Sequence, residues 1–291
     1  MERPLVMGVL NVTPDSFSDG GEFLDHDRAI SHGLEMIEQG ADVVDVGGES
    51  SRPGAAAVTE KEELRRVLPV IEALAGRVRV SVDTVKPAVA ARALDAGATL
   101  LNDISAAMWE LAAERGCGWV AMHMQGTPRT MQSDPRYSDV VSEVHHFLLD
   151  KAADAVRAGV KEVWVDPGIG FGKKPRHNLS LLRHMSDLVD GGFPVLVGTS
   201  RKSMLGLIAP NSDGTQAPVN ERAEASLAAA TWAMLSGAQM VRVHDVAATV
   251  QAATLVGSTR LGGPAIDGPS FRQSAVRDRE PIFAADPGGN R

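Results

Sequence analysis

The chain has 291 residues, of which 44% are hydrophobic, 23% are charged and only 4% are aromatic, and its formal net charge is −8. This composition is typical of a soluble globular protein, and the acidic balance gives no support for nucleic-acid or anionic-membrane binding, which would favour a basic patch. Cys117 is the only cysteine, which excludes an intramolecular disulfide and a cysteine metal cluster. The apolar run Leu5 to Leu10 is too short for a signal peptide, and no run is long enough to span a bilayer, so we expect a cytoplasmic protein.

Eight short apolar runs recur along the chain, and each stops at polar or charged side chains. Such runs, without polar alternation, are typical of strands buried on both faces of a parallel sheet. The runs are 5–10, 43–48, 78–82, 100–101, 119–122, 163–165, 195–199 and 240–243. The side chains that end them are Asn11, Glu49, Asp83, Asn102, Asp103, His123, Asp166, Ser200, Arg201, Lys202, Arg242 and His244. Because polar groups gather at one end of the strands, we expect a ligand site at the carboxyl edge of the sheet.

Helical segments fit between these runs. Five of them end in a glycine that suits the left-handed position after a last helical turn, at Gly40, Gly97, Gly116, Gly159 and Gly237. The expected helices are 27–39, one capped by Thr59, 87–96, 106–115, 138–158, 178–189, 220–236 and 246–256. Strict alternation of eight strands with eight helices predicts an α/β fold, the (β/α)8 TIM barrel.

One barrel domain is expected to cover residues 1–261. The stretch 262–291 is rich in Gly, Pro, Asp and Arg without periodicity, so we expect a disordered or loosely attached tail. The first and second strands are followed by long loops, at 12–26 and 50–58, which we expect to be mobile. Long βα loops are where barrels usually carry their function.

The parity of positions along each strand sorts the polar side chains. Arg242 and His244 lie two residues apart and point the same way, as do Asp166 and Trp164. A charge that faces a barrel interior is costly unless it is paired or used on a ligand. A ring of structural ion pairs is the alternative to a ligand site, and the number of ionisable groups favours the site. These groups are Asp83, Asp103, Asp166, Lys202, Arg242 and His244.

Two loops add chemistry to this edge. The segment 166–173 has glycines at alternate positions, which allows its backbone to approach a ligand, although no Walker pattern follows. The segment 11–21 carries amide, hydroxyl and carboxylate oxygens, the hard donors that suit Mg²⁺. Arg52 in the second long loop is either a surface residue or an anion clamp.

Six motifs that occur together and in order resemble the dihydropteroate synthase family. They are NVTPDSFSDGG from residue 11, GGESSRPG from 47, MHMQG from 122, DPGIGFGK from 166, GTSRK from 198 and RVHD from 242. The resemblance runs from Leu5 to about Leu261. It implies a cytoplasmic, typically homodimeric transferase of folate biosynthesis and a sulfonamide target. This transferase would join 6-hydroxymethyl-7,8-dihydropterin diphosphate to p-aminobenzoate and release pyrophosphate, with Mg²⁺ present.

The resemblance also implies roles for individual residues. Those that would bind the pterin are Asp83, Asn102, Met122, Asp166, Phe171 and Lys202. Those that would bind the pyrophosphate are Asn11, Arg52, Arg242 and His244. Those that would shape the p-aminobenzoate pocket are Phe17, Ser51, Arg52, Pro53, Ser200 and Lys202. Those that would hold Mg²⁺ are Asn11 and Asp19, and those that would be catalytic are Lys202, Asp83, Asp166 and Arg242.

The chemistry of these groups agrees with a dissociative displacement. Two carboxylates and an amide can match the N–H donors along one edge of a pterin. Asp83 and Asp166 would stabilise a pterin methylene cation after pyrophosphate leaves, and the neutral aryl amine would then attack. No strong base is required, so we expect His123 to position a neighbour. Ser51 stands where the family often has Thr, which keeps the hydroxyl and could change sulfonamide sensitivity.

Two other functions are compatible with a pterin-binding barrel. A pterin-binding methyltransferase barrel would need a corrinoid partner and would not need the loops 11–21 and 47–54, which are intact here. A catalytically silent paralogue could have lost Arg52, Lys202 or Arg242, and none is lost. Both observations favour the synthase.

Overall fold

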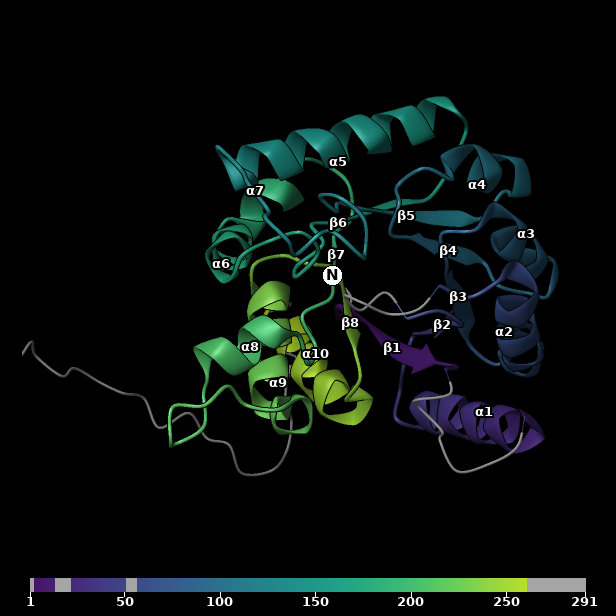
Figure 1. Ribbon diagram of the computed structural model, residues 1–291. Helices are drawn as coiled ribbons and strands as arrows, with labels where there is room; N and C mark the ends of the chain where they lie inside the picture. The colour runs from purple at the N-terminus through teal and green to yellow at the C-terminus, as the bar shows by residue number, and fades with distance from the viewer. Residues whose placement is uncertain (1–2, 14–21, 51–56, 261–291) are drawn as a thin grey trace, which may run out of the picture.

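A nearly closed ring of parallel strands with helices around it forms the body of the molecule, described here from a computed structural model for residues 3–13, 22–50 and 57–260 (Figure 1). The strand order is β6-β5-β4-β3-β2-β1-β8-β7, and one parallel bridge between Val165 and Val195 joins the two ends. The strands are β1 Leu5–Asn11, β2 Val43–Gly47, β3 Arg79–Asp83, β4 Leu100–Asp103, β5 Gly118–Met122, β6 Val163–Asp166, β7 Leu196–Val197 and β8 Met240–Val243. The predicted TIM barrel is confirmed.

The helices follow the predicted order with local differences. They are α1 Glu22–Glu38, α2 Glu60–Leu74, α3 Pro87–Asp95, α4 Trp109–Arg115, α5 Val140–Arg157, α6 Pro175–Arg183, α7 Met185–Val189, α8 Ser203–Ile208, α9 Ala223–Leu235 and α10 Val246–Arg260, with a 3-10 turn at Val219–Glu221. All five glycines predicted to end helices have positive φ, between 65° and 111°. No described helix has the length and apolar character that crossing a membrane would need.

Three helix predictions are wrong in detail. The first helix begins at Glu22, five residues before the predicted start, because the sequence has no Gly or Pro between Glu22 and Asp27. The fourth helix begins at Trp109 because Ala106 has a φ of 49°, which no right-handed helix accepts. The predicted sixth helix is two helices, α6 and α7, that break at His184, and a further short helix, α8, follows β7.

The barrel interior changes from apolar to polar along the strands. One apolar layer fills the lower interior with a side chain from every strand except β3: Met7, Val43, Leu100, Val120, Trp164, Leu196 and Met240. The positions two residues further along the same strands point into the same interior. On β2, β4, β6 and β8 these positions hold Asp45, Asn102, Asp166 and Arg242. The interior polar layer therefore lies directly above a packed floor, at the carboxyl end of the barrel.

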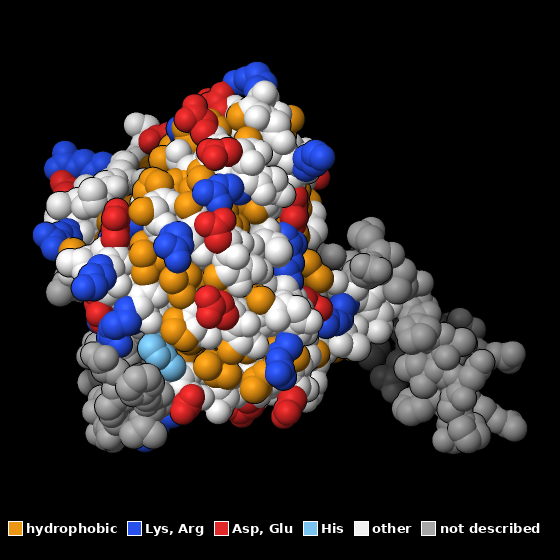
Figure 2. All heavy atoms as spheres, turned by 90° about the vertical axis from the view of Figure 1, so that its right-hand side faces the viewer, with side chains coloured by type: hydrophobic (Ala, Val, Ile, Leu, Met, Phe, Trp, Pro, Cys, Tyr) orange, Lys and Arg blue, Asp and Glu red, His pale blue; other side chains and the backbone are white. Residues whose placement is uncertain are grey.

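The amino-terminal end of the barrel holds paired charges. Arg79 at the start of β3 makes two bonds of 2.6 and 2.7 Å to Glu162, just before β6, and Trp164 Nε1 donates to the same carboxylate at 2.7 Å. Arg3 likewise makes two bonds of 2.8 and 2.9 Å to Asp42. On the outer face toward α1 to α4, acidic and basic side chains are intermingled, so no basic surface forms there (Figure 2).

Candidate active site

Neighbouring strands bring the candidate residues side by side at the carboxyl end of the barrel. The parallel register aligns Asn11, Gly47, Asp83 and Asn102 across β1 to β4, and it aligns Met122 with Asp166 across β5 and β6. Because all of these positions have interior parity, their side chains gather in one place. The sequence-predicted residues of five strands are thus brought together.

Arg242 on β8 joins two carboxylates across the polar layer. Its Nε lies 2.6 Å from Asp45 Oδ2, and its Nη2 lies 2.8 Å from Asp83 Oδ2. Asn102 Nδ2 donates to the same Asp45 oxygen at 2.9 Å. Arg242 uses two of its five N–H donors on these carboxylates within the described part of the chain, so its planar fork retains capacity for phosphate oxygens.

Asp45 is the residue that sequence reasoning missed. It is fully buried inside the barrel, and its Oδ1 has no hydrogen-bond partner among the described residues. The ionisable residues predicted for the site end the apolar runs, whereas Asp45 lies within one, between Val44 and Val46. The parity that assigns Gly47 to the interior assigns Asp45 to it as well, so the signal was present in the sequence.

The prediction that Asp103 joins the site is wrong. Asp103 follows Asn102 directly, and adjacent strand residues point to opposite faces, so only one of them can face the interior. Its carboxylate lies on the helix side of the sheet, where Oδ2 accepts from the backbone N–H groups of Ala107 and Met108 at 2.8 Å each and from Trp119 Nε1 at 3.1 Å. It therefore organises the turn that precedes α4.

Burial shifts the ionisation of several groups in the polar layer. Burial raises the pKa of Asp83 to about 7, and the positive charge of Arg242 opposes this shift. Burial also raises the pKa of Asp166, against the attraction of Lys202. Burial lowers the pKa of Lys202 to about 8, while Asp166 favours the charged form. Asp83 and Lys202 therefore titrate close to neutral pH, as functional groups in a binding site often do.

Lys202 and Phe171 form one wall of the site. Lys202 follows β7, and its Nζ donates to the carbonyl of Ile169 and lies 4.7 Å from the centre of the Phe171 ring. The interior positions Gly47 and Gly198 add no side chain between the flanking residues. A Cβ on Gly198 would lie 3.7 Å from Arg242 Cβ and 3.8 Å from Lys202 Nζ. A side chain at either glycine would therefore lie in contact with the candidate residues.

His244 and Ser200 lie together beside β8. The Ser200 hydroxyl is 3.0 Å from His244 Nδ1 and accepts from the His244 backbone N–H at 3.2 Å. A cavity of about 450 Å³ lies on the α1 and α10 side of His244, and His32 of α1 and Ala247 of α10 line it together with His244. Ser200, predicted for the aminobenzoate pocket, thus contacts a residue predicted for the pyrophosphate.

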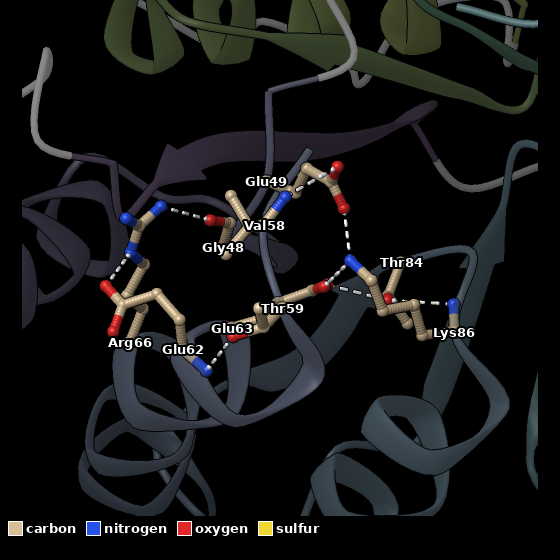
Figure 3. A network of polar contacts seen from close by, with 9 residues as sticks. All are labelled: Gly48, Glu49, Val58, Thr59, Glu62, Glu63, Arg66, Thr84 and Lys86. Atoms are coloured by element: carbon tan, nitrogen blue, oxygen red, sulfur yellow. Dashed lines mark hydrogen bonds and ion pairs between the residues drawn. The ribbon is translucent and has the colours of Figure 1, made fainter. Parts of the chain in front are cut away.

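The stem of the second long loop is held by a charged network (Figure 3). Glu49 Oε1 accepts from the Val58 backbone N–H at 3.2 Å, which ties the two ends of the segment together. Lys86 forms ion pairs with both Glu49 and the buried Glu63, and Thr84 Oγ1 donates to Glu63 at 2.7 Å. Glu49, predicted only as a strand ending, therefore anchors the loop that follows it.

Five predicted site residues lie outside the described residues, as does the predicted tail at 262–291. They are Phe17, Asp19, Ser51, Arg52 and Pro53. The described residues contain no group of three or more His, Cys, Asp or Glu side chains that could hold a metal ion. Asn11 supplies one oxygen donor at the end of β1. One protein oxygen is compatible with Mg²⁺, which keeps several waters and binds substrate phosphates.

Comparison with known sequences gives a family. The sequence model of the family described as pterin binding enzyme matches residues 7–244. The dihydropteroate synthase of Escherichia coli (strain K12) is 46% identical over 260 residues, which cover 87% of this chain and 90% of that protein. The dihydropteroate synthase of Mycobacterium leprae (strain TN) is 46% identical over 257 residues, with coverage of 85% and 90%.

Solved structures agree. The Yersinia pestis dihydropteroate synthase in complex with a sulfonamide drug aligns with a TM-score of 0.81 and 47% identity, covering 89% of this chain and 95% of that one. The Xanthomonas albilineans dihydropteroate synthase in complex with 7,8-dihydropteroate gives a TM-score of 0.78 and 42% identity, with coverage of 89% and 94%. The resemblance predicted from the six motifs is confirmed. The chain belongs to the pterin-binding enzyme family and, within it, to the dihydropteroate synthases, which are transferases.

Proposed function

We propose that this chain condenses 6-hydroxymethyl-7,8-dihydropterin diphosphate with p-aminobenzoate to give 7,8-dihydropteroate and pyrophosphate in folate biosynthesis. The observation that carries the proposal is the convergence of Asp83, Asn102, Asp166, Lys202 and Arg242 at one end of the barrel. This set combines acceptors for a flat heterocycle with cations for its leaving group. A pterin-binding methyltransferase would use the first half of that set alone.

The pterin edge would be matched by the carboxyls of Asp83 and Asp166 and the amide of Asn102. Asp83 and Asp166 can accept N–H donors of the ring or, when protonated, return a hydrogen bond, and the raised pKa of each carboxyl favours such exchange. Asn102 offers both a donor and an acceptor. Met122, which is 3% exposed, and the Phe171 ring supply apolar surface for the two faces of the heterocycle.

The diphosphate would lie toward β1 and β8. Arg242 presents its remaining N–H donors there, His244 adds a ring nitrogen, and Arg52 belongs to the same proposed group. Asn11 and Asp19 would hold Mg²⁺, which when bound neutralises charge on the diphosphate oxygens. The pKa of Arg242 is raised by Asp45 and Asp83 despite its burial, so its charge is permanent in this site.

We propose a dissociative order of bond changes. The bond between the pterin methylene carbon and the diphosphate oxygen breaks first, and its electron pair leaves with the diphosphate toward Arg242. The methylene cation that remains is conjugated with the pterin ring, and ionised Asp83 and Asp166 stabilise it electrostatically. The neutral amine of p-aminobenzoate then attacks this carbon and loses a proton to solvent.

The p-aminobenzoate would bind beside Lys202 and Ser200, with Phe17, Ser51, Arg52 and Pro53 completing its pocket. A sulfonamide would occupy the same pocket, which makes the chain a proposed sulfonamide target. Ser51 in place of the more frequent Thr removes a methyl group, and such a change in an apolar contact is worth about 1 kcal/mol. One partly buried cysteine suits a reducing compartment, and we propose the cytoplasm.

A product assay tests the proposal directly. Purified protein is mixed with dihydropterin diphosphate, p-aminobenzoate and Mg²⁺, and dihydropteroate is measured by chromatography and mass spectrometry. We expect product that depends on both substrates and is lost in excess chelator. Absence of product above background would reject the synthase, and full activity in chelator would reject the role of Mg²⁺ alone.

We also propose a homodimer formed through α9 and α10. Trp232 and Leu235 on α9 are 56% and 60% exposed, and Leu255 on α10 is 67% exposed, which is unusual for large apolar side chains that lie on neighbouring helices. Light scattering should give twice the chain mass, and Leu235→Glu with Leu255→Glu should give a monomer. A monomeric wild type at micromolar concentration would reject the dimer and leave the synthase proposal untouched.

A further inference from the structure

Lys173 is a buried charge that the proposed reaction does not use. It ends the glycine-rich segment after β6, and only 2% of it is exposed. Its Nζ lies 2.9 Å from His123 Nδ1 and 3.1 Å from the His123 carbonyl. It lies 3.0 Å from each of the carbonyls of Gly168 and Phe171. Three carbonyls and one imidazole nitrogen thus surround a single ammonium group.

All four groups around this lysine are hydrogen-bond acceptors, which favours the ammonium form, whereas burial opposes it. Burial lowers the pKa of His123 to about 3, so its ring is neutral and its Nδ1 lone pair faces the ammonium as an acceptor. Burial lowers the pKa of Lys173 to about 7, and the negative charge of Asp166 opposes that shift. An ammonium offers three N–H donors to the four acceptors, whereas a neutral amine offers two. His123 supplies two of the four acceptors around Lys173, which supports the prediction that it positions a neighbour.

The segment around Lys173 can take its path only with glycine. Gly168 and Gly172 both have a φ of 63°. A Cβ on Gly168 would lie 2.0 Å from the His123 carbonyl oxygen, and one on Gly172 would lie 2.4 Å from the Gln125 carbonyl oxygen. The backbone after β6 is thus packed directly on the backbone after β5, with the Lys173 ammonium between them.

The same segment also faces the reactive side of the barrel. Asp166 Oδ1 accepts from the Gly168 N–H at 2.7 Å, which couples the segment to the carboxylate of β6. The carbonyls of Gly168 and Phe171 point to Lys173, while the intervening carbonyl of Ile169 accepts from Lys202. The backbone from Gly168 to Phe171 is therefore held between two lysines. Lys173 contacts it on the side away from the site, and Lys202 contacts it within the site.

We propose that Lys173 is a positioning residue whose ammonium acts as an internal cation, fixing the segment from Asp166 to Phe171 in the conformation that binds the pterin. The inference rests on the proposed function, because Asp166 and Phe171 are assigned there to the pterin. Removal of the ammonium leaves three carbonyls and an imidazole facing one another without a donor. The segment then relaxes, and the two pterin-binding side chains at its ends shift with it.

The test replaces the ammonium and follows both activity and backbone protection. Lys173→Met keeps the length of the apolar stem. The adjacent Lys174→Met is the matched control, since the Lys174 side chain is 42% exposed and forms a long ion pair of 3.7 Å with Asp134. We expect Lys173→Met to lower kcat/KM for the dihydropterin diphosphate by about 100-fold, because a displacement near 1 Å has that effect. Most of the loss should lie in KM, and the KM for p-aminobenzoate should change less. Amide hydrogen exchange at Gly168 and Gly170 should accelerate in Lys173→Met and not in Lys174→Met.

A chemical rescue separates positioning from folding. Lys173→Ala lacks three carbons and the ammonium, which propylammonium replaces, so added propylammonium should restore kcat/KM and slow the exchange of the Gly168 amide. Tetramethylammonium, which has the charge but no N–H donor, should not.

Three outcomes are distinguishable. Folded Lys173→Met with wild-type exchange and kcat/KM would overturn the inference. Failure of both Lys173 variants to fold, with propylammonium present, would make Lys173 a folding residue and overturn it as well. An inactive wild type whose segment still loses protection in Lys173→Met would reject the proposed function and retain the positioning role.

Discussion

The two ends of the barrel treat charge differently. At the amino-terminal end, Arg79 and Glu162 pair one to one through two bonds, and Trp164 adds a third to the same carboxylate. At the carboxyl end, Arg242 is divided between Asp45 and Asp83. Asp45 Oδ1 and the Ser81 hydroxyl, aligned across β2 and β3, have no hydrogen-bond partner among the described residues.

The difference separates charges that serve the fold from charges that serve a ligand. A pair whose hydrogen bonds are complete needs nothing further, whereas buried groups with incomplete bonding cost free energy unless another molecule supplies the missing partners. Three carboxyls, Asp45, Asp83 and Asp166, share two cations at the carboxyl end. These groups therefore lower the folding stability of the ligand-free protein, and a bound ligand that supplies the missing partners would restore that stability.

The largest effect should come from Arg242→Met, which breaks the carboxyl-end arrangement. It removes the guanidinium from the diphosphate and leaves Asp45 buried without its cation. We expect kcat/KM to fall by about 1,000-fold, as for the loss of a donor to developing negative charge. The free energy of unfolding should fall by about 3–5 kcal/mol in urea denaturation, as for a broken buried pair. Activity within tenfold of the wild type would contradict the diphosphate role.

A smaller effect is expected from Asp45→Asn, which keeps the shape and removes one charge. Asp45 orients both Arg242 and Asn102, so the amide should misalign the two without unfolding the chain. We expect kcat/KM for the dihydropterin diphosphate to fall by about 10- to 100-fold, the value of one charge-assisted hydrogen bond. Asp42→Asn, at the opposite end, is the matched control and should leave steady-state kinetics unchanged.

Asp83→Asn should change the pH dependence of stability. The ordinary pKa of the carboxyl is 3.8, and burial raises it to about 7 in the folded chain. Below about pH 4 the carboxyl is neutral in both states, and this contribution is fully present. As the pH rises from about 4 to 7, the unfolded chain ionises first, so the wild type loses stability relative to Asp83→Asn by up to about 1.4 kcal/mol per pH unit.

That difference should become constant above about pH 7, where Asp83 is ionised in both states. Urea unfolding of the two proteins between pH 4 and 8.5 measures it. A stability difference that is independent of pH would mean that Asp83 is ionised throughout. Binding of the pterin substrate to Asp83→Asn, measured by calorimetry at pH 7, should be weaker than to the wild type.

The smallest effect should come from Arg79→Met, which breaks the amino-terminal pair. The side chains of Arg79 and Glu162 are 29% and 38% exposed, so water screens their attraction and we expect a loss of about 1 kcal/mol or less. Enzyme kinetics should equal those of the wild type. A loss of activity larger than twofold would mean that the two ends of the barrel are coupled.

The sequence predicts the strands and the helix ends of this fold well. Short runs that end at polar side chains predicted all eight strands, and the five glycines after helices all have positive φ. It predicted less where contacts are distant in sequence. The partners of Asp45 lie 57 and 197 residues away in the sequence. The acceptors around Lys173 come from the two segments that follow β5 and β6, and no periodicity in the sequence indicates that these segments are in contact. The helix break at His184 carries no Gly or Pro in the sequence, so nothing local marks it.

The single Val165–Val195 bridge makes the β6–β7 boundary the thinnest seam in an otherwise continuous ring. Opening there would separate Asp166 from Lys202 without disturbing the other strand pairs. A heterocycle that contacts both side chains would hold β6 and β7 together. Ligand binding and closure of the barrel would then stabilise one another. The boundary between β6 and β7 would be the first part of the ring to open on warming, and the bound ligand would stabilise that boundary.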